Sequence, residues 1–137
     1  RVTLRPAPTD EQMELFRNGM TLEGDENRTA PADIRIVSGE KADGSRSDRV
    51  VAEIVLYEGR NRQIRRMFDG MKIEVARLRR VAIGNVKLGM LGLGSWRELD
   101  PREVLSLENA SKAPPVQTKP TAAKGEERKH GIHRPRR

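Results

Sequence analysis

The stretch VVAEIVLYEGRNRQIRRMFDGM, residues 50–71, contains the strongest strand candidate of the chain and, directly after it, a helix with one apolar side. Apolar residues fill almost all of positions 50–56, which favours a buried strand. With Ile64 as the origin and about 100° per residue, Met67, Phe68 and Met71 lie within about 60° of it. We therefore predict a strand over 50–59 and an amphipathic helix over 61–71 whose buried side carries Ile64.

The rest of the chain continues this alternation of strands and helices. Reading outward adds strands at 1–4, 32–37 and 73–84, a helix at 9–19 that Thr9 or Asp10 caps and Gly19 ends, and, over 96–107, a short strand with a closing helix capped by Asp100. The order strand–helix–strand–strand–helix–strand is that of the ferredoxin-like split βαβ arrangement, in which two helices cover one face of the sheet. We therefore predict an α+β fold of this kind over residues 1–108. Many unrelated functions share that arrangement, so the order alone says nothing about chemistry.

Positive charge is concentrated in two parts of the chain. The 137 residues include 27 Lys and Arg against 20 Asp and Glu, a net charge of +7. The region 60–87 carries nine basic residues against Asp69 and Glu74, while the rest of residues 1–110 is net acidic. A basic stripe on a nearly neutral body is typical of a protein that binds a polyanion, most often a nucleic acid. The alternative is a charged face that contacts only solvent.

The second basic region is the C-terminal tail. Beyond Ser111 the chain is rich in Pro, Ala and Lys and holds almost no large apolar residues. Such a segment cannot bury enough apolar surface to offset the entropy cost of ordering it. We therefore predict a disordered basic tail over 109–137 that adds sequence-independent affinity for a nucleic acid. Its two histidines, His130 and His133, do not predict a metal site, because they lie in a disordered segment of a chain without cysteine.

Four arginines occupy seven residues around the start of the second predicted helix: Arg60, Arg62, Arg65 and Arg66. On the helical projection, Arg62 and Arg66 lie opposite the apolar side, where they would contact solvent or phosphate. Arg65 lies at the edge of the core, where a guanidinium is well placed to hold one fixed carboxylate or phosphate. The alternative is an arginine whose aliphatic part only covers the edge of the core.

The strand predicted over 73–84 carries three more arginines, Arg77, Arg79 and Arg80. Arg77 and Arg79 alternate with Leu78, so they would share one face of the sheet near the arginines of the helix. Arg80 interrupts the alternation. Together the two groups would make one continuous basic surface, which favours binding over chance.

Composition excludes several other kinds of site. Without cysteine the chain can have no disulfide, thiolate nucleophile or Cys-bound zinc. A chain without cysteine suits a reducing compartment, so we expect a cytoplasmic protein. No apolar run approaches the length of a membrane span. One Trp, one Tyr and two Phe are too few for a base-stacking platform. The Gly-x-x-Gly within 89–94 has an apolar interior and predicts an anchored loop, and the carboxylates at 23–26 predict a turn.

Four blocks of sequence resemble one enzyme family, in the same order: EGRNRQIRRMF (58–68), VARLRRVAIGNVKLG (75–89), GSWREL (94–99) and DPREVLSL (100–107). Over residues 1–107 the chain resembles the C-terminal part of the bacterial ribosomal RNA pseudouridine synthases that modify single uridines in small- or large-subunit RNA. The Gly-Arg-x-x-Gln-Ile-Arg core at 59–65 is the specific part of the resemblance. It implies that the α+β unit is one half of a pseudouridine synthase catalytic domain.

The resemblance also implies a reaction, the isomerisation of uridine to pseudouridine without metal or organic cofactor. The glycosidic bond is cleaved, the base rotates, and it rejoins through carbon 5. The essential aspartate of the family lies in an Arg-Leu-Asp motif that this chain lacks, since Leu99-Asp100 fits a helix cap. Arg65 matches the family arginine that pairs with that aspartate and keeps it ionised. The implied contacts to ribosomal RNA phosphates are Arg60, Arg62, Arg66, Arg77, Arg79 and Arg80.

Two functions stay open at this point. The chain begins RVTLRP inside a predicted strand, which suggests a fragment. In the first reading it is the C-terminal part of a synthase whose missing N-terminal half carries the aspartate, so that the chain alone converts no uridine. In the second it is a non-catalytic RNA-binding module derived from such an enzyme. An aspartate motif encoded upstream of Arg1 would decide for the enzyme, which we favour.

Overall fold

The structure is a computed structural model, and it describes residues 1–112. Of the tail predicted over 109–137, residues 113–137, with His130 and His133, lie outside the described residues. The elements in chain order are β1 (Val2–Arg5), α1 (Asp10–Asn18), β2 (Asp33–Glu40), β3 (Arg46–Val55), α2 (Gln63–Gly70), β4 (Glu74–Leu78), β5 (Ala82–Ile83), β6 (Val86–Lys87) and α3 (Pro101–Lys112).

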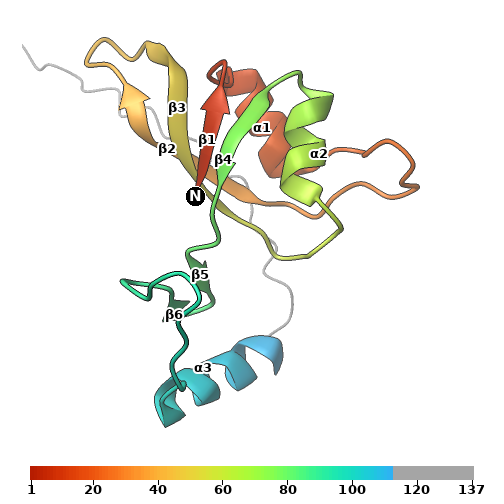
Figure 1. The fold of residues 1–137 in the computed structure, drawn as a ribbon. Helices are drawn as coiled ribbons and strands as arrows, with labels where there is room; N and C mark the ends of the chain where they lie inside the picture. Colours follow the sequence, from red (N-terminus) through yellow and green to blue (C-terminus); the bar gives the residue numbers. More distant parts are fainter. Residues whose placement is uncertain (113–137) are drawn as a thin grey trace, which may run out of the picture.

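Four of the strands form one antiparallel sheet in the order β2-β3-β1-β4. β1 lies in the middle and pairs with β3 on one side, Leu4 opposite Val50, and with β4 on the other. The pairing with β4 shifts register between Thr3 and Leu4. Helices α1 and α2 pack side by side against the sheet (Figure 1). The fold is therefore α+β, as predicted, with the sheet split between two strand–helix–strand segments.

The core lies between the sheet and the two helices. Alternate residues of the strands, among them Leu4 and Val50, are buried against Met67 and the aromatic rings of Phe16 and Phe68. The two rings stack with their centroids 5.1 Å apart and 21° between their planes. Aromatic pairs of this geometry contribute roughly 0.5–1.5 kcal/mol beyond the area that they bury. The stack joins α1 to α2 and so fixes the position of the arginine-rich helix.

Both ends of α1 follow the sequence prediction. Thr9 caps the helix, because its Oγ1 accepts a hydrogen bond from the Gln12 backbone N–H (3.2 Å) while Gln12 Oε1 accepts one from the Thr9 N–H (3.0 Å). This reciprocal pair is a capping box. Gly19 ends the helix with φ at +90°, and a Cβ there would lie 2.2 Å from the Thr29 carbonyl oxygen. Only glycine fits this close approach.

The C-terminal third departs from the prediction. β4 ends at Leu78, so the single strand predicted over 73–84 is wrong. Ala82–Ile83 and Val86–Lys87 instead pair as a separate hairpin, which turns at Gly84 with φ at +55°. The short strand predicted within 96–99 is also absent from the described residues. Two-residue strands are too short to show a period in the sequence.

Helix α3 begins where the sequence predicted. The Glu103 backbone N–H donates to Asp100 Oδ1 (2.9 Å), which confirms Asp100 as the cap. The helix continues to Lys112, so residues 109–112, which the sequence placed in the tail, are helical. Within the described part of the chain no helix combines the length and apolar character needed to cross a membrane.

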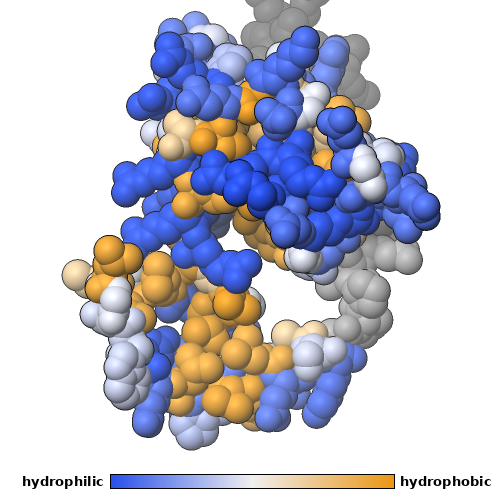
Figure 2. All heavy atoms as spheres, turned by 45° about the vertical axis from the view of Figure 1, so that its right-hand side comes forward, coloured by the Kyte–Doolittle hydropathy of each residue, from blue (hydrophilic) through white to orange (hydrophobic). Residues whose placement is uncertain are grey.

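Two regions of the described chain are set apart in space (Figure 1). We call residues 1–78, with the sheet, α1 and α2, the body, and residues 79–112, with the hairpin and α3, the arm. Every buried apolar side chain belongs to the body. Figure 2 shows mainly polar side chains over the body and apolar side chains gathered over the arm.

Candidate functional site

The turn between β3 and α2 is built around a buried glutamine. Gln63 Oε1 accepts a hydrogen bond from the Arg60 backbone N–H (3.1 Å), and Gln63 Nε2 donates to Glu58 Oε1 (3.0 Å). Arg62, directly before the helix, has a left-handed backbone with φ at 50° and ψ at 32°. Residues other than glycine seldom adopt that conformation, and they do so where the surrounding structure enforces it. Gln63 therefore fixes the path of the turn and the directions in which its arginines leave.

Two of the four arginines share one carboxylate. Asp25 Oδ2 lies 3.2 Å from Nη1 of Arg60, and Asp25 Oδ1 lies 2.9 Å from Nη2 of Arg66. Glu58 adds a contact of 3.3 Å to Nε of Arg60. We call Asp25, Glu58, Arg60 and Arg66 the Asp25 cluster. Its side chains are between 24% and 31% exposed, so water screens these pairs less than it screens pairs on an open surface.

The same arginines bind the backbone of the loop that carries Asp25. Arg60 donates to the carbonyl oxygens of Asn27 (2.9 Å) and Arg28 (2.7 Å), and Arg66 donates to that of Glu23 (3.0 Å). Carbonyls that accept from a guanidinium are strong partners because the donor is charged. The loop between α1 and β2 is therefore held firmly against the start of α2.

The loop has a closed base and a turn at its tip. At the base, the Met20 backbone N–H donates to Thr29 Oγ1 and the Thr29 N–H donates to the Met20 carbonyl, both at 2.9 Å. At the tip, the Asp25 N–H donates to the Leu22 carbonyl (3.0 Å), which agrees with the predicted turn. Leu22 is buried and anchors the loop in the core. Asp25 is thus presented from a rigid support.

Hydrogen bonds from Arg66 and then Arg60 hold the pKa of Asp25 below its usual value, although desolvation acts in the opposite direction. Asp25 is therefore ionised throughout the neutral pH range. The sequence treated the carboxylates at 23–26 only as turn residues. For Asp25 that was incomplete, because its side chain links the loop to two arginines.

Arg65 differs from its neighbours. It is half-buried at the edge of the core, the position that the helical projection predicted. Within residues 1–112 no hydrogen-bond or ion-pair partner of its guanidinium is present. Arg62 is exposed. The prediction that Arg66 faces solvent or phosphate together with Arg62 is wrong, because the Asp25 loop folds over that side of α2.

The remaining arginines do not extend the surface of α2 as expected. Arg77 lies opposite Thr3 in the sheet, and the neighbours of Thr3, Val2 and Leu4, are buried under the helices. Arg77 therefore lies on the face that the helices leave open. Arg79 and Arg80 follow the end of β4 and are exposed. The single basic face predicted from the sequence is wrong, since its residues are divided between both faces of the sheet and the arm.

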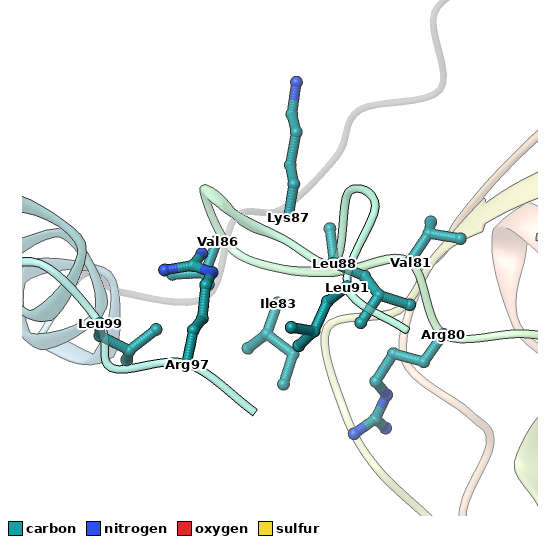
Figure 3. Close-up of a pocket in the computed structure, with 10 residues that line it drawn as sticks. Arg80, Val81, Ile83, Val86, Lys87, Leu88, Leu91, Arg97 and Leu99 are labelled. Atoms are coloured by element: carbon teal, nitrogen blue, oxygen red, sulfur yellow. The ribbon is translucent and has the colours of Figure 1, made fainter. Parts of the chain in front are cut away.

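The arm contains an open apolar pocket of about 360 Å³. It is lined by Val81, Ile83, Val86, Leu88, Leu91 and Leu99, with Arg80 and Arg97 among its lining residues. In Figure 3 Ile83, Leu88 and Leu91 lie between Arg97 and Arg80, Leu99 lies on the far side of Arg97, and Lys87 points away. Leu91 is the apolar anchor expected in the Gly-x-x-Gly loop, whereas Leu93 of the same loop is exposed. Trp96, the single tryptophan of the chain, is 80% exposed in the arm.

Other candidate groups have structural partners. Tyr57 donates its hydroxyl proton to Asp33 Oδ2 (2.8 Å), and this hydrogen bond raises the pKa of the Tyr57 phenol. Among residues 1–112 no three His, Asp or Glu side chains come together as metal ligands would. Sequence reasoning missed Glu58 and the structural task of Gln63. The signal for Gln63 was its place in the Gly-Arg-x-x-Gln-Ile-Arg core, where a polar residue lies on the buried side of a helix.

Comparisons with known proteins point to one enzyme family. The chain is 36% identical over 100 residues to the ribosomal large subunit pseudouridine synthase B of Bacillus subtilis, an overlap of 73% of this chain and 38% of the relative. It is 40% identical over 85 residues to the dual-specificity RNA pseudouridine synthase RluF of Escherichia coli, covering 62% of this chain and 29% of the relative. No family model matches the chain.

A solved structure described as a pseudouridylate synthase is similar to the described fold. The TM-score is 0.62 at 27% identity, and the match covers 77% of this chain and 44% of the other. The matches thus cover less than half of the length of each of these proteins. The resemblance read from the sequence blocks is confirmed by the relatives and by this structure.

Proposed function

Because this chain is homologous to part of the bacterial ribosomal RNA pseudouridine synthases, we propose that it is the C-terminal portion of the catalytic domain of such an enzyme. The reaction would be the isomerisation of uridine to pseudouridine in ribosomal RNA, without metal or organic cofactor, in the cytoplasm. The nucleophilic aspartate would come from a partner segment, the N-terminal half of the domain, and the chain alone would be inactive. The strand order β2-β3-β1-β4 supports the ferredoxin-like description of this half.

The observation that carries the proposal is the state of Arg65. Its neighbours Arg60 and Arg66 are paired with Asp25, whereas Arg65 is half-buried and has no partner among the described residues. A partly desolvated guanidinium is stabilised by a carboxylate, and a planar fork can hold that carboxylate in one orientation. A cation beside an aspartate also keeps the aspartate ionised at neutral pH. Arg65 therefore suits the task of positioning a catalytic carboxylate supplied from outside residues 1–112.

The apolar pocket of the arm supports the same partner. Monomeric proteins seldom expose contiguous apolar surface of this kind, and such patches mark interfaces. The relatives are much longer than this chain, so they contain the additional polypeptide that the proposal requires. We propose that the N-terminal half covers Ile83, Leu88 and Leu91.

Ribosomal RNA would be held by the arginines that are exposed. Arg62, Arg77, Arg79 and Arg80 meet this condition. Arg60 and Arg66, which the sequence predicted alongside them, already have carboxylate and carbonyl partners in the Asp25 cluster. Phosphate contacts fix the register of a protein on RNA and carry no sequence information themselves. Which uridine is modified would therefore depend on other parts of the enzyme.

The test compares the chain alone with the protein extended by the polypeptide encoded upstream of Arg1. Each is incubated with unmodified ribosomal RNA, and pseudouridine is mapped by carbodiimide-stop sequencing. Only the extended protein should modify a defined uridine. Product from the chain alone would contradict the proposal. An extended protein that binds RNA without forming product would instead support the non-catalytic RNA-binding module.

Substitutions in the extended protein separate Arg65 from its neighbour Arg62. Arg65→Lys keeps the charge but loses the planar fork, so single turnover should fall by something like 10²-fold while RNA affinity changes little. Arg62→Lys is the matched control and should turn over almost normally. Normal turnover by Arg65→Lys would remove the positioning role of Arg65.

A further inference from the structure

Arg60 and Arg66 already use most of their guanidinium donors within the body. All three nitrogens of the Arg60 guanidinium are used: Nε by Glu58, Nη1 by Asp25 and the Asn27 carbonyl, and Nη2 by the Arg28 carbonyl. A guanidinium has five N–H donors in a fixed plane, so contacts at every nitrogen leave little room for a bidentate phosphate.

Arg66 is engaged in a similar way from the other side of Asp25. Its Nη2 donates to Asp25 Oδ1 at 2.9 Å and to the Glu23 carbonyl at 3.0 Å, and its Nη1 lies 3.4 Å from the Asn61 carbonyl. Asp25 therefore bridges the two arginines with one oxygen each. An RNA phosphate would have to compete with the loop between α1 and β2 for these donors.

The two other arginines of the group are in the opposite situation. Arg62 is exposed, and Arg65 has no partner within residues 1–112. Both belong to the turn before α2 and to α2 itself, which the Asp25 cluster holds in place. The loop thus divides four closely spaced cations into two that are neutralised internally and two that are available to ligands.

We propose that Asp25 is a positioning residue that withholds Arg60 and Arg66 from RNA, so that this part of the molecule offers only Arg62 and Arg65. The inference rests on RNA being the partner, as proposed above, but not on the catalytic role of Arg65. As a consequence, two of the three arginines in this group expected to contact phosphate, Arg60 and Arg66, instead bind groups within the protein, and only Arg62 remains. The cluster sets the orientation of α2 rather than the strength of RNA binding.

The experiment measures how the affinity of the whole chain for polyuridylate depends on salt. Each phosphate contact to single-stranded RNA adds about 0.7 to the slope of log affinity against log salt. Asp25→Asn should steepen the slope, by at most about 1.4 if both arginines then bind phosphate, because it removes the carboxylate that Arg60 and Arg66 share. Glu26→Gln is the matched control: it removes the same charge from the neighbouring exposed residue of the loop, and it should leave the slope unchanged.

Two further variants keep the proposal testable if Asp25→Asn unfolds the chain, which circular dichroism would show. With Asp25 intact, Arg66→Ala should leave the slope at its wild-type value, while Arg62→Ala should reduce it by about 0.7. The triple variant Asp25→Asn, Arg60→Ala, Arg66→Ala should return to the wild-type slope.

The inference is overturned if Arg66→Ala lowers the slope as much as Arg62→Ala does, or if folded Asp25→Asn and Glu26→Gln behave alike. Absence of polyuridylate binding by every form would overturn it as well, together with the RNA partner. The pseudouridine assay is independent of these slopes, so failure of the catalytic proposal and failure of this one are separately visible.

Discussion

The body and the arm obtain their structure in different ways. The body buries twelve apolar side chains between its sheet and two helices, whereas no side chain of the arm is buried. The arm nevertheless holds Ile83, Leu93 and Trp96, all largely exposed. The arm has no core of its own, so it has no buried contacts whose loss would make it unfold as a separate cooperative unit. The comparison indicates that the body sets its own fold, whereas the arm leaves its large apolar side chains exposed.

The largest expected difference comes from shortening one large apolar side chain in each region. Phe68→Ala removes the ring that stacks on Phe16 and should lower the free energy of unfolding by about 3–5 kcal/mol. Leu93→Ala in the arm should change it by less than about 0.5 kcal/mol, because Leu93 is exposed. Urea unfolding followed by circular dichroism measures both. Equal effects would mean that the arm has a core in solution.

Glycine substitutions provide a second contrast. Gly19 and Gly94 both have positive φ, but a Cβ meets the Thr29 carbonyl only at Gly19, and open space at Gly94. Gly19→Ala should cost at least about 1–3 kcal/mol from backbone strain, with the clash in addition. Gly94→Ala should leave the thermal midpoint of the body unchanged. A comparable loss at Gly94 would show that the loop of the arm is coupled to the body.

A smaller effect of opposite sign is expected after α2. Lys72 follows the end of α2 and has φ at +58°. The Lys72 N–H donates to the Asp69 carbonyl and the Ile73 N–H donates to the Phe68 carbonyl, which together form a Schellman motif. This motif favours glycine at the position of Lys72. Lys72→Gly should therefore stabilise the body by about 0.5 kcal/mol, the relief of left-handed strain less the added entropy of the unfolded chain. Lys87→Gly in the arm is the control and should produce no gain. Destabilisation by Lys72→Gly would contradict the assignment.

The smallest effect concerns pH and the start of α3 in the arm. Hydrogen bonds from Arg97, and then from the Asp100 backbone, lower the pKa of Glu103 to about 2. A lowered folded pKa means that the start of α3 is fully stabilised above the ordinary glutamate range and loses this stabilisation as the pH falls toward about 2. The protection factors of the α3 amides against hydrogen exchange should fall over that interval. Glu103→Gln should remove the dependence; a persisting dependence would assign it to another group.

The sequence predicted the features that depend on neighbouring residues better than those that depend on residues far apart in the chain. Helix caps at Thr9 and Asp100 and the buried side of α2 follow from neighbouring residues, and the structure confirms them. The pairing of Asp25 with Arg66 joins residues 41 positions apart, and no local period encodes such a contact. The end of β4 at Leu78 was missed because apolar and basic residues continue the strand pattern beyond it.

For the candidate site, the sequence located the arginines but not their partners. Charge spacing identified Arg60, Arg62, Arg65 and Arg66 as one group, and the helical projection separated Arg65 from Arg62. The separation of Arg66 from Arg62 required the loop between α1 and β2, whose path depends on the buried Leu22 and on the bonds at Thr29. Tertiary contacts decided which cations remain available.

The exposed indole of Trp96 gives the arm an optical signal of its own. The chain has one tryptophan and one tyrosine, Tyr57, which lies in the body and donates its hydroxyl proton to Asp33. Excitation selective for tryptophan therefore records the surroundings of the arm and nothing from the body. Emission characteristic of an indole in water should shift to shorter wavelength when another polypeptide covers the Trp96 side chain. Docking at the arm can thus be followed in real time without attaching a label.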